Sequence, residues 1–166
     1  MSEHSFAIHR LKYWIPALLV AILISTFSTH YFSDEQTGRI ILPILHWLFP
    51  RATQHTLHLM HIGIRKLAHV TEFGVFSTTV FRGVRAERIG WQASWALITL
   101  LIAAAYASLD ELHQWFVPFR HATPRDVAID TFGALLAQLI VWWYATGKWP
   151  FGTIEKNLRA ANSHSS

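Results

Sequence analysis

The sequence predicts an all-α integral membrane protein, built as a four-helix transmembrane bundle with an interfacial helical segment between the first and second spans. Hydrophobic residues make up 52% of the chain and charged residues only 14%, which is unusual for a soluble domain of 166 residues. Apolar stretches recur with lengths near those that a hydrocarbon core of about 30 Å requires. Arginines gather in one short loop between two of these stretches, as in cytoplasmic loops of membrane proteins.

The net charge of +4 does not indicate a nucleic-acid-binding protein. The basic residues lie in short groups beside apolar runs, and the chain contains no nucleic-acid-binding motif. The chain also has no cysteine, which excludes a disulfide framework and thiolate chemistry. We therefore interpret the basic groups as topology signals and expect no nucleic-acid partner.

The first span is expected from Tyr13 to about Phe32, after a polar segment that ends with Arg10 and Lys12. This run is long enough to cross a bilayer. A cleaved signal peptide is the alternative, but the apolar core of such a peptide is shorter and ends in small residues. The first apolar run is therefore expected to remain as a transmembrane helix.

Residues 33–64 have a mixed character and are expected to lie in the membrane interface. The apolar piece within them, residues 40–50, is about half as long as a span. Pro43 is expected to break this piece and Pro50 to end it, while Trp47 anchors it at the interface. The segment then forms an interfacial cap between two spans.

His55, His58 and His61 repeat every three residues in this mixed segment. One interpretation is a set of metal ligands on one helix face. The other is the polar face of a short interfacial helix. No carboxylate or cysteine completes a ligand set nearby, which favours the second interpretation.

The remaining spans are expected at residues 66–81, 91–115 and 124–145. Arg82, Arg85 and Arg88 lie between the second and third spans and mark the cytoplasmic side. Pro124 suits the first turn of the fourth span, where its missing N–H group costs nothing.

Four spans place both termini on the same side of the membrane, together with the arginine-rich loop. We therefore expect a cytoplasmic N-terminus over residues 1–12 and a membrane domain over residues 13–146. The Ser-rich residues 147–166 are expected to form a cytoplasmic, disordered tail.

Polar residues interrupt the spans at places that all reach the outer membrane face in this orientation. Lys66, His69 and Glu72 follow one another at intervals of three and share one arc of a helix. A charge facing lipid costs at least about 2.5 kcal/mol, so these side chains need partners on other helices. The candidate partners are Asp110, Glu111, Gln114, Arg120, Arg125, Asp126 and Asp130. The sequence thus predicts one shallow polar site near the outer surface.

Small residues on the fourth span support this arrangement. Gly133 and Ala137 extend the stripe of Asp126 and Asp130 with a four-residue spacing that allows another helix to approach closely. The polar stripe is therefore expected to face the interior of the bundle.

The predicted site is rich in carboxyl groups. Five acidic side chains face three cationic ones, and His69 can add a fourth positive charge. Like charges in a partly dry site cannot all ionise, so a carboxyl holds a proton, His69 is charged, or a cation is bound. A buried salt-bridge network that only fixes helix packing is the alternative.

These stretches together resemble the VanZ-like family of small bacterial membrane proteins. The family pattern is Lys-x-x-His-x-x-Glu-aromatic, then Asp-Glu-x-x-Gln, an Arg-containing loop, and Asp-x-x-x-(Asn or Asp)-x-x-Gly. The positions that carry the resemblance are Lys66, His69, Glu72, Phe73, Asp110, Glu111, Gln114, Arg120, Asp126, Asp130 and Gly133. Phe119 departs from a common Gly and Asp130 from a common Asn, so the loop geometry and the site charge can differ. The resemblance implies a bacterial cytoplasmic membrane protein, linked through the founding member to low-level resistance to the glycopeptide teicoplanin. It implies no known reaction.

The first hypothesis of function is a site for an envelope lipid or a lipid-linked cell-wall precursor. The expected binding residues are Lys66, Gln114, Arg120, Arg125, Asp126 and Asp130. The three cations among them would hold a phosphate or another anionic headgroup. The expected catalytic residues are His69, Glu72, Asp110 and Glu111, with the imidazole as base and a carboxylate to orient it. No Ser or Cys nucleophile accompanies them, and whether a reaction is catalysed stays open.

Two other hypotheses remain. A proton- or cation-coupled carrier could use the acidic groups as a relay, and with four spans it would work best as a homodimer. A structural partner of another membrane complex would need no chemistry at all. No cofactor is predicted, and a divalent cation held by His69 and carboxylates is a variant of the first hypothesis.

Overall fold

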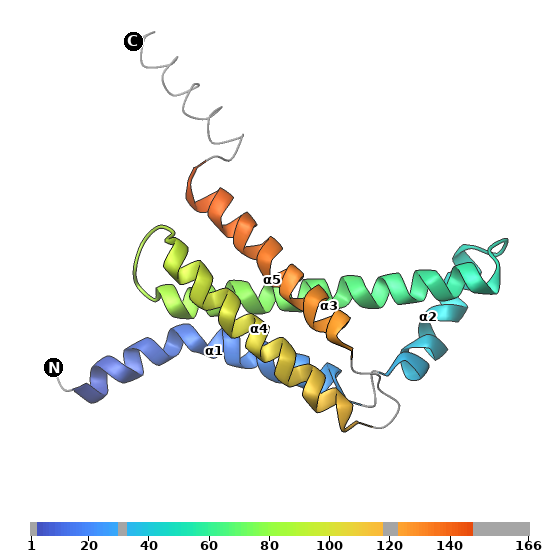
Figure 1. Cartoon of the computed structure of the whole chain (residues 1–166), viewed down its shortest axis with the longest axis horizontal. Coiled ribbons are helices and arrows are strands. Elements are labelled where there is room, and N and C mark those ends of the chain that lie inside the picture. The colour runs from blue at the N-terminus through green and yellow to red at the C-terminus, as the bar shows by residue number, and fades with distance from the viewer. Residues whose placement is uncertain (1–2, 30–32, 118–122, 148–166) are drawn as a thin grey trace, which may run out of the picture.

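The computed structural model describes residues 3–29, 33–117 and 123–147. Within these residues the chain forms five α-helices and no strand (Figure 1). The helices are α1 (Glu3–Phe27), α2 (Asp34–Leu48), α3 (Gln54–Arg85), α4 (Ala93–Trp115) and α5 (Pro124–Ala145). The predicted all-α class is confirmed for this part of the chain.

Hydroxyl side chains cap the N-termini of α2 and α3. Ser33 Oγ accepts a hydrogen bond from the backbone N–H of Gln36, and Thr53 Oγ1 accepts one from the N–H of Thr56. Each bond satisfies an N–H group that has no partner within its own helix. Pro124 begins α5, where a backbone N–H would have had no partner.

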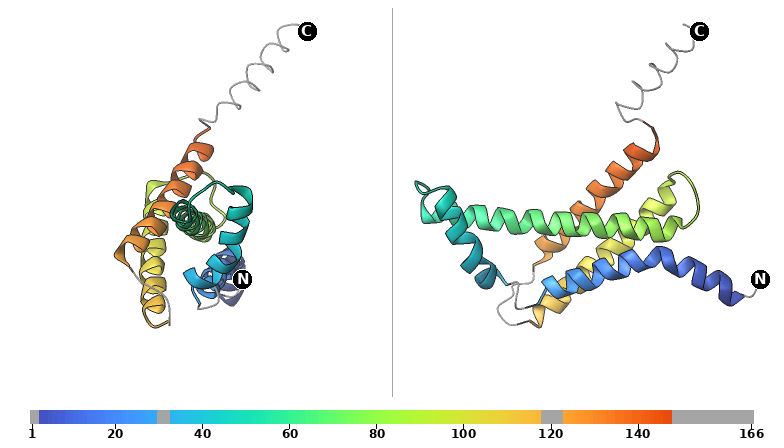
Figure 2. Two further views of the ribbon diagram at one scale, coloured as in Figure 1. Left: turned by 90° about the vertical axis from the view of Figure 1, so that its right-hand side faces the viewer. Right: turned by 180° about the vertical axis from the view of Figure 1, so that it is seen from behind.

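α3 is the central helix, with 32 residues, and it packs against each of the other four helices (Figures 1 and 2). It unites two predicted elements, the short interfacial helix before residue 65 and the second span at residues 66–81. Gly63 lies near the junction, but one glycine costs a helix only about 1 kcal/mol and does not end it.

α2 lies beside the N-terminal half of α3 (Figures 1 and 2). The prediction that Pro43 breaks this segment is wrong, because the helix continues through Pro43 to Leu48. Pro43 is exposed, so the backbone carbonyl that loses its partner there is near the surface. Gly38 and Leu45 are the buried residues of α2. The exposed apolar residues form a stripe at helical spacing: Ile40, Ile44, Trp47 and Leu48.

The helices α1, α3, α4 and α5 alternate in direction, so that the end of α1, the end of α4 and the start of α5 lie on the same side of the bundle, while the N-terminal part of α3 extends beyond them (Figure 1). Ser28, just after α1, contacts Asp110 near the end of α4, and Thr123, just before α5, contacts Glu111. We call this region, together with residues 65–72 of α3, the polar end.

The opposite region joins the first turns of α1 after residue 9 to the end of α3. Tyr13 of α1 lies 3.4 Å from Glu87 in the loop between α3 and α4, measured from Tyr13 Oη to Glu87 Oε1. We call this region the basic end because it contains Arg10 together with the arginines at the end of α3 and in the following loop.

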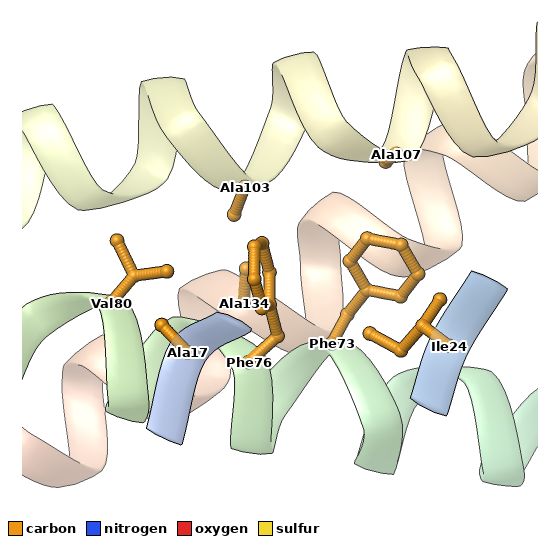
Figure 3. Packing of buried hydrophobic residues seen from close by; sticks show 8 residues of the cluster. All are labelled: Ala17, Ile24, Phe73, Phe76, Val80, Ala103, Ala107 and Ala134. Atoms are coloured by element: carbon orange, nitrogen blue, oxygen red, sulfur yellow. The ribbon is translucent and has the colours of Figure 1, made fainter. Parts of the chain in front are cut away.

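An apolar core lies between the two ends (Figure 3). Its buried members are Ala17, Ile24, Phe73, Phe76, Val80, Ala103, Ala107 and Ala134. The alanines come from the helices that surround α3, and they leave room for the rings of Phe73 and Phe76. The ring of Tyr106 lies 4.7 Å from that of Phe76, centroid to centroid. The core therefore depends on aromatic side chains of α3 packed against small residues.

α3 and α5 cross in close contact at Gly133. A Cβ atom on Gly133 would collide with the carbonyl oxygen of Val70 and would lie 2.8 Å from its Cα. Further along the seam, Gln138 Nε2 donates to Ser77 Oγ at 2.8 Å, and Ser77 Oγ donates to the carbonyl of Ala134. The predicted small-residue stripe therefore does allow a backbone-to-backbone approach.

Three helical segments of the described chain are long and apolar enough to cross a membrane: Arg10–Phe27, Ala93–Trp115 and Pro124–Ala145. Large apolar side chains on them stay exposed, including Leu18, Leu101 and Ile140. Helices of this length and hydropathy with large exposed apolar side chains indicate a membrane protein. The predicted four-span count is not confirmed, because α3 is not among these segments; polar residues such as Lys66 and Glu72 interrupt it.

Candidate functional site

His69 of α3 and Asp130 of α5 form the innermost pair of the polar end. The tight crossing at Gly133 brings the two helices close enough for this contact. His69 Nδ1 lies 3.3 Å from Asp130 Oδ1, and the Asp130 side chain is only 1% exposed. Neither Asp130 oxygen accepts a hydrogen bond from the part of the chain that the structure describes. The contact at 3.3 Å thus places a buried carboxyl group beside Nδ1 of the imidazole.

Asp110 of α4 ties the end of α1 to α4. Its Oδ2 accepts a hydrogen bond from Ser28 Oγ at 2.7 Å and another from Gln114 Nε2 at 2.8 Å. All three side chains are buried. Gln114 lies one helical turn after Asp110, a spacing at which two side chains of a helix can interact.

Glu111 of α4 forms a hydrogen bond with the residue that precedes α5. Its Oε2 accepts a hydrogen bond from the backbone N–H of Thr123 at 2.8 Å. Thr123 Oγ1 in turn donates to Asp126 Oδ2 at 2.9 Å. Glu111 is buried and Asp126 half-buried, so both carboxyl groups of this contact serve the first turn of α5.

A cavity of about 200 Å³ opens beside His69, between the end of α1, α2 and α3. Its polar lining comes from Ser28, Thr37, Arg65, His69 and Glu72. Apolar residues such as Ile41 and Ile64 form much of the remaining wall. The cavity is therefore mainly apolar, and an arginine, a histidine and a glutamate are among the residues that line it. We call it the polar-end cavity.

A second polar network connects α2 to α3 beside the polar-end cavity. Asp34 Oδ1 lies 3.4 Å from Arg65 Nε and 3.7 Å from His61 Nδ1. Arg65 Nη1 donates to Thr37 Oγ1 at 2.9 Å, and Thr37 Oγ1 lies 3.3 Å from His61 Nε2. Burial lowers the pKa of His61 from its usual 6.5, while Asp34 opposes this shift. His61 is therefore expected to be neutral at pH 7 and to act as a hydrogen-bonding partner of α2.

The structure does not bring every predicted site residue to the polar-end cavity. Lys66 and Arg125 are exposed and do not line it, and Arg120 lies outside the described residues. Arg65 lines the cavity instead of Lys66. Residues 65, 69 and 72 share a face because their intervals of four and three follow the helical repeat, whereas Lys66 is turned about 100° from Arg65. That periodicity in the sequence could have identified Arg65.

Ser28 and Thr37 were also missed by the sequence analysis. Ser28 ends an apolar run, and its polarity could have indicated a partner on another helix. Thr37 carries no comparable signal, because a threonine in the first turns of an exposed helix is common. Only the packing of α2 on α3 shows its role.

The described residues contain no group of three or more His, Cys, Asp or Glu side chains placed to hold a metal ion. His55 and His58 are exposed, whereas His61 is buried against α2. The three histidines of the repeat therefore do not face one common point.

The geometry of the polar-end cavity suits an anionic group. The guanidinium of Arg65, which already contacts Thr37 and Asp34, contributes positive charge that attracts phosphate or carboxylate oxygens. His69 faces the same space with Asp130 behind its Nδ1, so its Nε2 is the ring nitrogen that can exchange a proton with a ligand. Such a site can bind an anion, and an imidazole backed by a carboxylate can also act as a general base.

Comparison with known proteins finds no matching curated protein and no matching solved structure. A family model described as VanZ/LLP1 matches residues 12–145, which include all five helices except the first turns of α1.

Proposed function

The chain belongs to the VanZ/LLP1 family, and from this premise we propose that it binds or modifies the anionic headgroup of an envelope lipid or lipid-linked cell-wall precursor at the polar-end cavity. The observation that carries the proposal is the meeting of Arg65, His69 and Glu72 in one cavity, with Asp130 buried behind the imidazole.

The proposal includes α3 as a fourth span. Its exposed neighbours α1, α4 and α5 pack around it, and Phe73 and Phe76 are buried within the bundle. A helix shielded by others can cross a membrane with polar side chains that would be costly on a lipid-facing helix. The protein is then a four-span bundle, and its two ends lie at opposite membrane faces.

The charges give the orientation. Arg82, Arg85 and Arg88 lie at the basic end, close in space to the N-terminal part of α1. Short basic loops remain in the cytoplasm, so the basic end and both termini are cytoplasmic. The polar end then faces the outside of the bacterial cytoplasmic membrane, where cell-wall precursors are used.

The size of the polar-end cavity supports a headgroup as the ligand. About 200 Å³ is below the roughly 300–1,000 Å³ typical of pockets that enclose a whole drug-sized molecule. A phosphate-bearing headgroup would enter beside Arg65, and the acyl or prenyl chain would stay along the lipid-facing helices. Lys66 and Arg125, which are exposed at this end, would attract the headgroup from outside the cavity.

The stripe of exposed apolar residues on α2 fits this arrangement. Trp47 and Ile40 lie on the side of α2 that the rest of the chain leaves exposed. An amphipathic helix of this kind lies in the membrane interface with its apolar face toward the acyl chains. α2 would then act as a lipid-facing wall of the polar-end cavity.

The test compares lipids and lipid-linked precursors, by mass spectrometry, from cells with and without the protein. We expect a changed headgroup if the protein is an enzyme, or co-purification of an unchanged lipid if it is a binder. His69→Gln and Arg65→Gln should abolish the effect while the amount of protein stays normal. Arg39→Gln is the control, because Arg39 is exposed and pairs only with Glu35 among the contacts described.

A purely structural role is the second candidate, favoured by the closed network of Ser28, Asp110 and Gln114. If His69→Gln and Arg65→Gln both remove the protein from the membrane, the structural role is supported. Teicoplanin susceptibility of the same strains provides a separate readout, since the resemblance implies low-level resistance. Loss of resistance with normal protein amounts would favour the headgroup site.

A further inference from the structure

The basic end contains a second cavity, of about 370 Å³. Its lining includes Arg10, Trp14, Gly83, Arg88, Ile98 and Ile102. It lies between the N-terminal part of α1, the end of α3 and the first half of α4. None of these residues belongs to the polar-end cavity, and we call this space the basic-end cavity.

Two arginines from different elements line the basic-end cavity. Arg10 belongs to α1, and Arg88 belongs to the loop between α3 and α4. The Arg88 side chain donates hydrogen bonds to the carbonyls of Arg85 and Val84, and its Cζ lies 4.5 Å from the ring centroid of Trp95. These contacts hold Arg88 in place while only two of its five N–H donors are used in them. The lining therefore contains one cation that is held in place, Arg88, and a second one from another helix, Arg10.

The charge around the basic-end cavity favours an anion. Lys12, Arg82 and Arg85 lie in the adjoining turns, and Glu87 is the one acidic residue between positions 73 and 109. By contrast, the polar end gathers several carboxyl groups around His69. The excess of positive charge at the basic end thus attracts a negatively charged ligand.

The remaining walls of the basic-end cavity are apolar and reach the lipid-facing surface. Trp14 is 37% exposed and Ile98 46% exposed, although both line the cavity. Their exposed sides continue into the apolar faces of α1 and α4. A ligand with a charged head and a hydrocarbon tail would match both parts of the cavity.

We propose that the basic-end cavity binds an anionic phospholipid, with its phosphate between Arg10 and Arg88 and an acyl chain against Trp14 and Ile98. Basic pockets between membrane helices on the cytoplasmic side bind such headgroups through the same combination of charge and apolar contact. This site is independent of the headgroup site at the polar end. It would fix the depth and the orientation of the bundle in the membrane.

The test is native mass spectrometry of the full chain in mixed micelles that contain phosphatidylglycerol or phosphatidylcholine. Arg10→Gln with Arg88→Gln removes both cavity cations and should weaken phosphatidylglycerol binding at least about tenfold, since each interfacial Lys or Arg contributes about 1 kcal/mol. Arg39→Gln with Arg51→Gln is the matched control, because it removes two exposed cations elsewhere. The control should bind phosphatidylglycerol as the unmodified chain does.

Ile98→Trp is a second variant that keeps every charge and fills the apolar side of the basic-end cavity. It should also weaken phosphatidylglycerol binding, and it keeps the proposal testable if the double arginine variant fails to fold. Binding of phosphatidylcholine should be the same in all variants. Equal phosphatidylglycerol affinity in the unmodified chain and the cavity variants would overturn the proposal. Displacement of the lipid by millimolar inorganic phosphate would also overturn it, because the site would then be one for free phosphate.

Discussion

The two ends of the bundle are held together in different ways. At the polar end, α3 and α5 approach backbone to backbone at Gly133, and buried side chains hydrogen-bond between helices. At the basic end, the ring of Trp14 lies against Gly83, next to a cavity, and Arg10, Arg82 and Arg88 are exposed. The polar end can therefore restrict the positions of its side chains more tightly, whereas the basic end can adjust to what lies beside it.

This difference matches the roles proposed for the two ends. A site that orients His69 against Asp130 needs helices that do not shift relative to each other. A site that takes up the headgroup of a membrane lipid can tolerate some movement of its walls. Four substitutions test the difference, and their expected effects decrease from Gly133→Ala, through Asp110→Ala and Gly83→Ala, to Tyr13→Phe.

Gly133→Ala should cause the largest loss of stability. The new methyl group would meet the backbone of Val70, which cannot move without separating α3 from α5. We expect a loss of about 3 kcal/mol or more in the free energy of unfolding, measured by denaturant titration in mixed micelles. Gly63→Ala is the control, because a Cβ there meets nothing within 4 Å and should stabilise α3 by about 0.5–1 kcal/mol. Similar stability of the two variants would contradict the tight crossing.

Asp110→Ala should be the next most damaging change. It leaves the buried Ser28 hydroxyl and the Gln114 amide without their shared acceptor. An unsatisfied buried polar group costs about 1–3 kcal/mol, and we expect a loss in that range in the same titration. Glu35→Ala removes an exposed carboxylate paired with Arg39 and should cost at most about 0.5 kcal/mol. A loss for Asp110→Ala no larger than that control would show that the polar end is not held by its buried network.

The sequence predicted the bounds of α5 and nearly those of α4, because both are apolar runs with a clear start. The helix α3 was harder to predict, since it combines an interfacial part with a part inside the bundle and has no single hydrophobic pattern. α2 was predicted as a broken segment from Pro43, and only tertiary packing shows that the helix continues. Helix propensity describes a residue in isolation. In this segment the contact between α2 and α3 outweighed the low helix propensity of proline.

The site was partly predictable for a similar reason. The family-like motifs pointed to His69, Asp110 and Asp130, whose spacing along each helix is visible in the sequence. The pairing of His69 with Asp130 depends on how two helices cross, which no local pattern contains. The sequence predicted Lys66 because residues 66, 69 and 72 follow one another at intervals of three. The side of α3 that faces the cavity carries residues 65, 69 and 72, at intervals of four and three.

Gly83→Ala should cost about 1 kcal/mol, less than the same change at Gly133. A Cβ on Gly83 would lie 2.7 Å from Trp14 Cδ2, but this ring is a partly exposed side chain beside a cavity and can turn away. Adding Trp14→Leu to Gly83→Ala should remove most of the steric cost, which a double-mutant cycle of unfolding free energies measures. If the two substitutions change the free energy of unfolding additively, the ring of Trp14 does not clash with a methyl group at position 83.

Tyr13→Phe should have the smallest effect, within about 0.5 kcal/mol of the unmodified chain, because surface substitutions rarely exceed this range. The hydroxyl of Tyr13 lies 3.4 Å from Glu87 in an exposed contact, so water can replace the lost partner. Its counterpart at the polar end is Ser28→Ala, which deletes the buried 2.7 Å bond to Asp110 and should cost about 1–2 kcal/mol. Both changes remove one hydroxyl group from α1 or its end, so the burial of the bond is the main difference between them. Equal losses of stability in Tyr13→Phe and Ser28→Ala would mean that these hydrogen bonds contribute equally at the two ends. The difference between the polar end and the basic end would then depend only on the packing at the glycines.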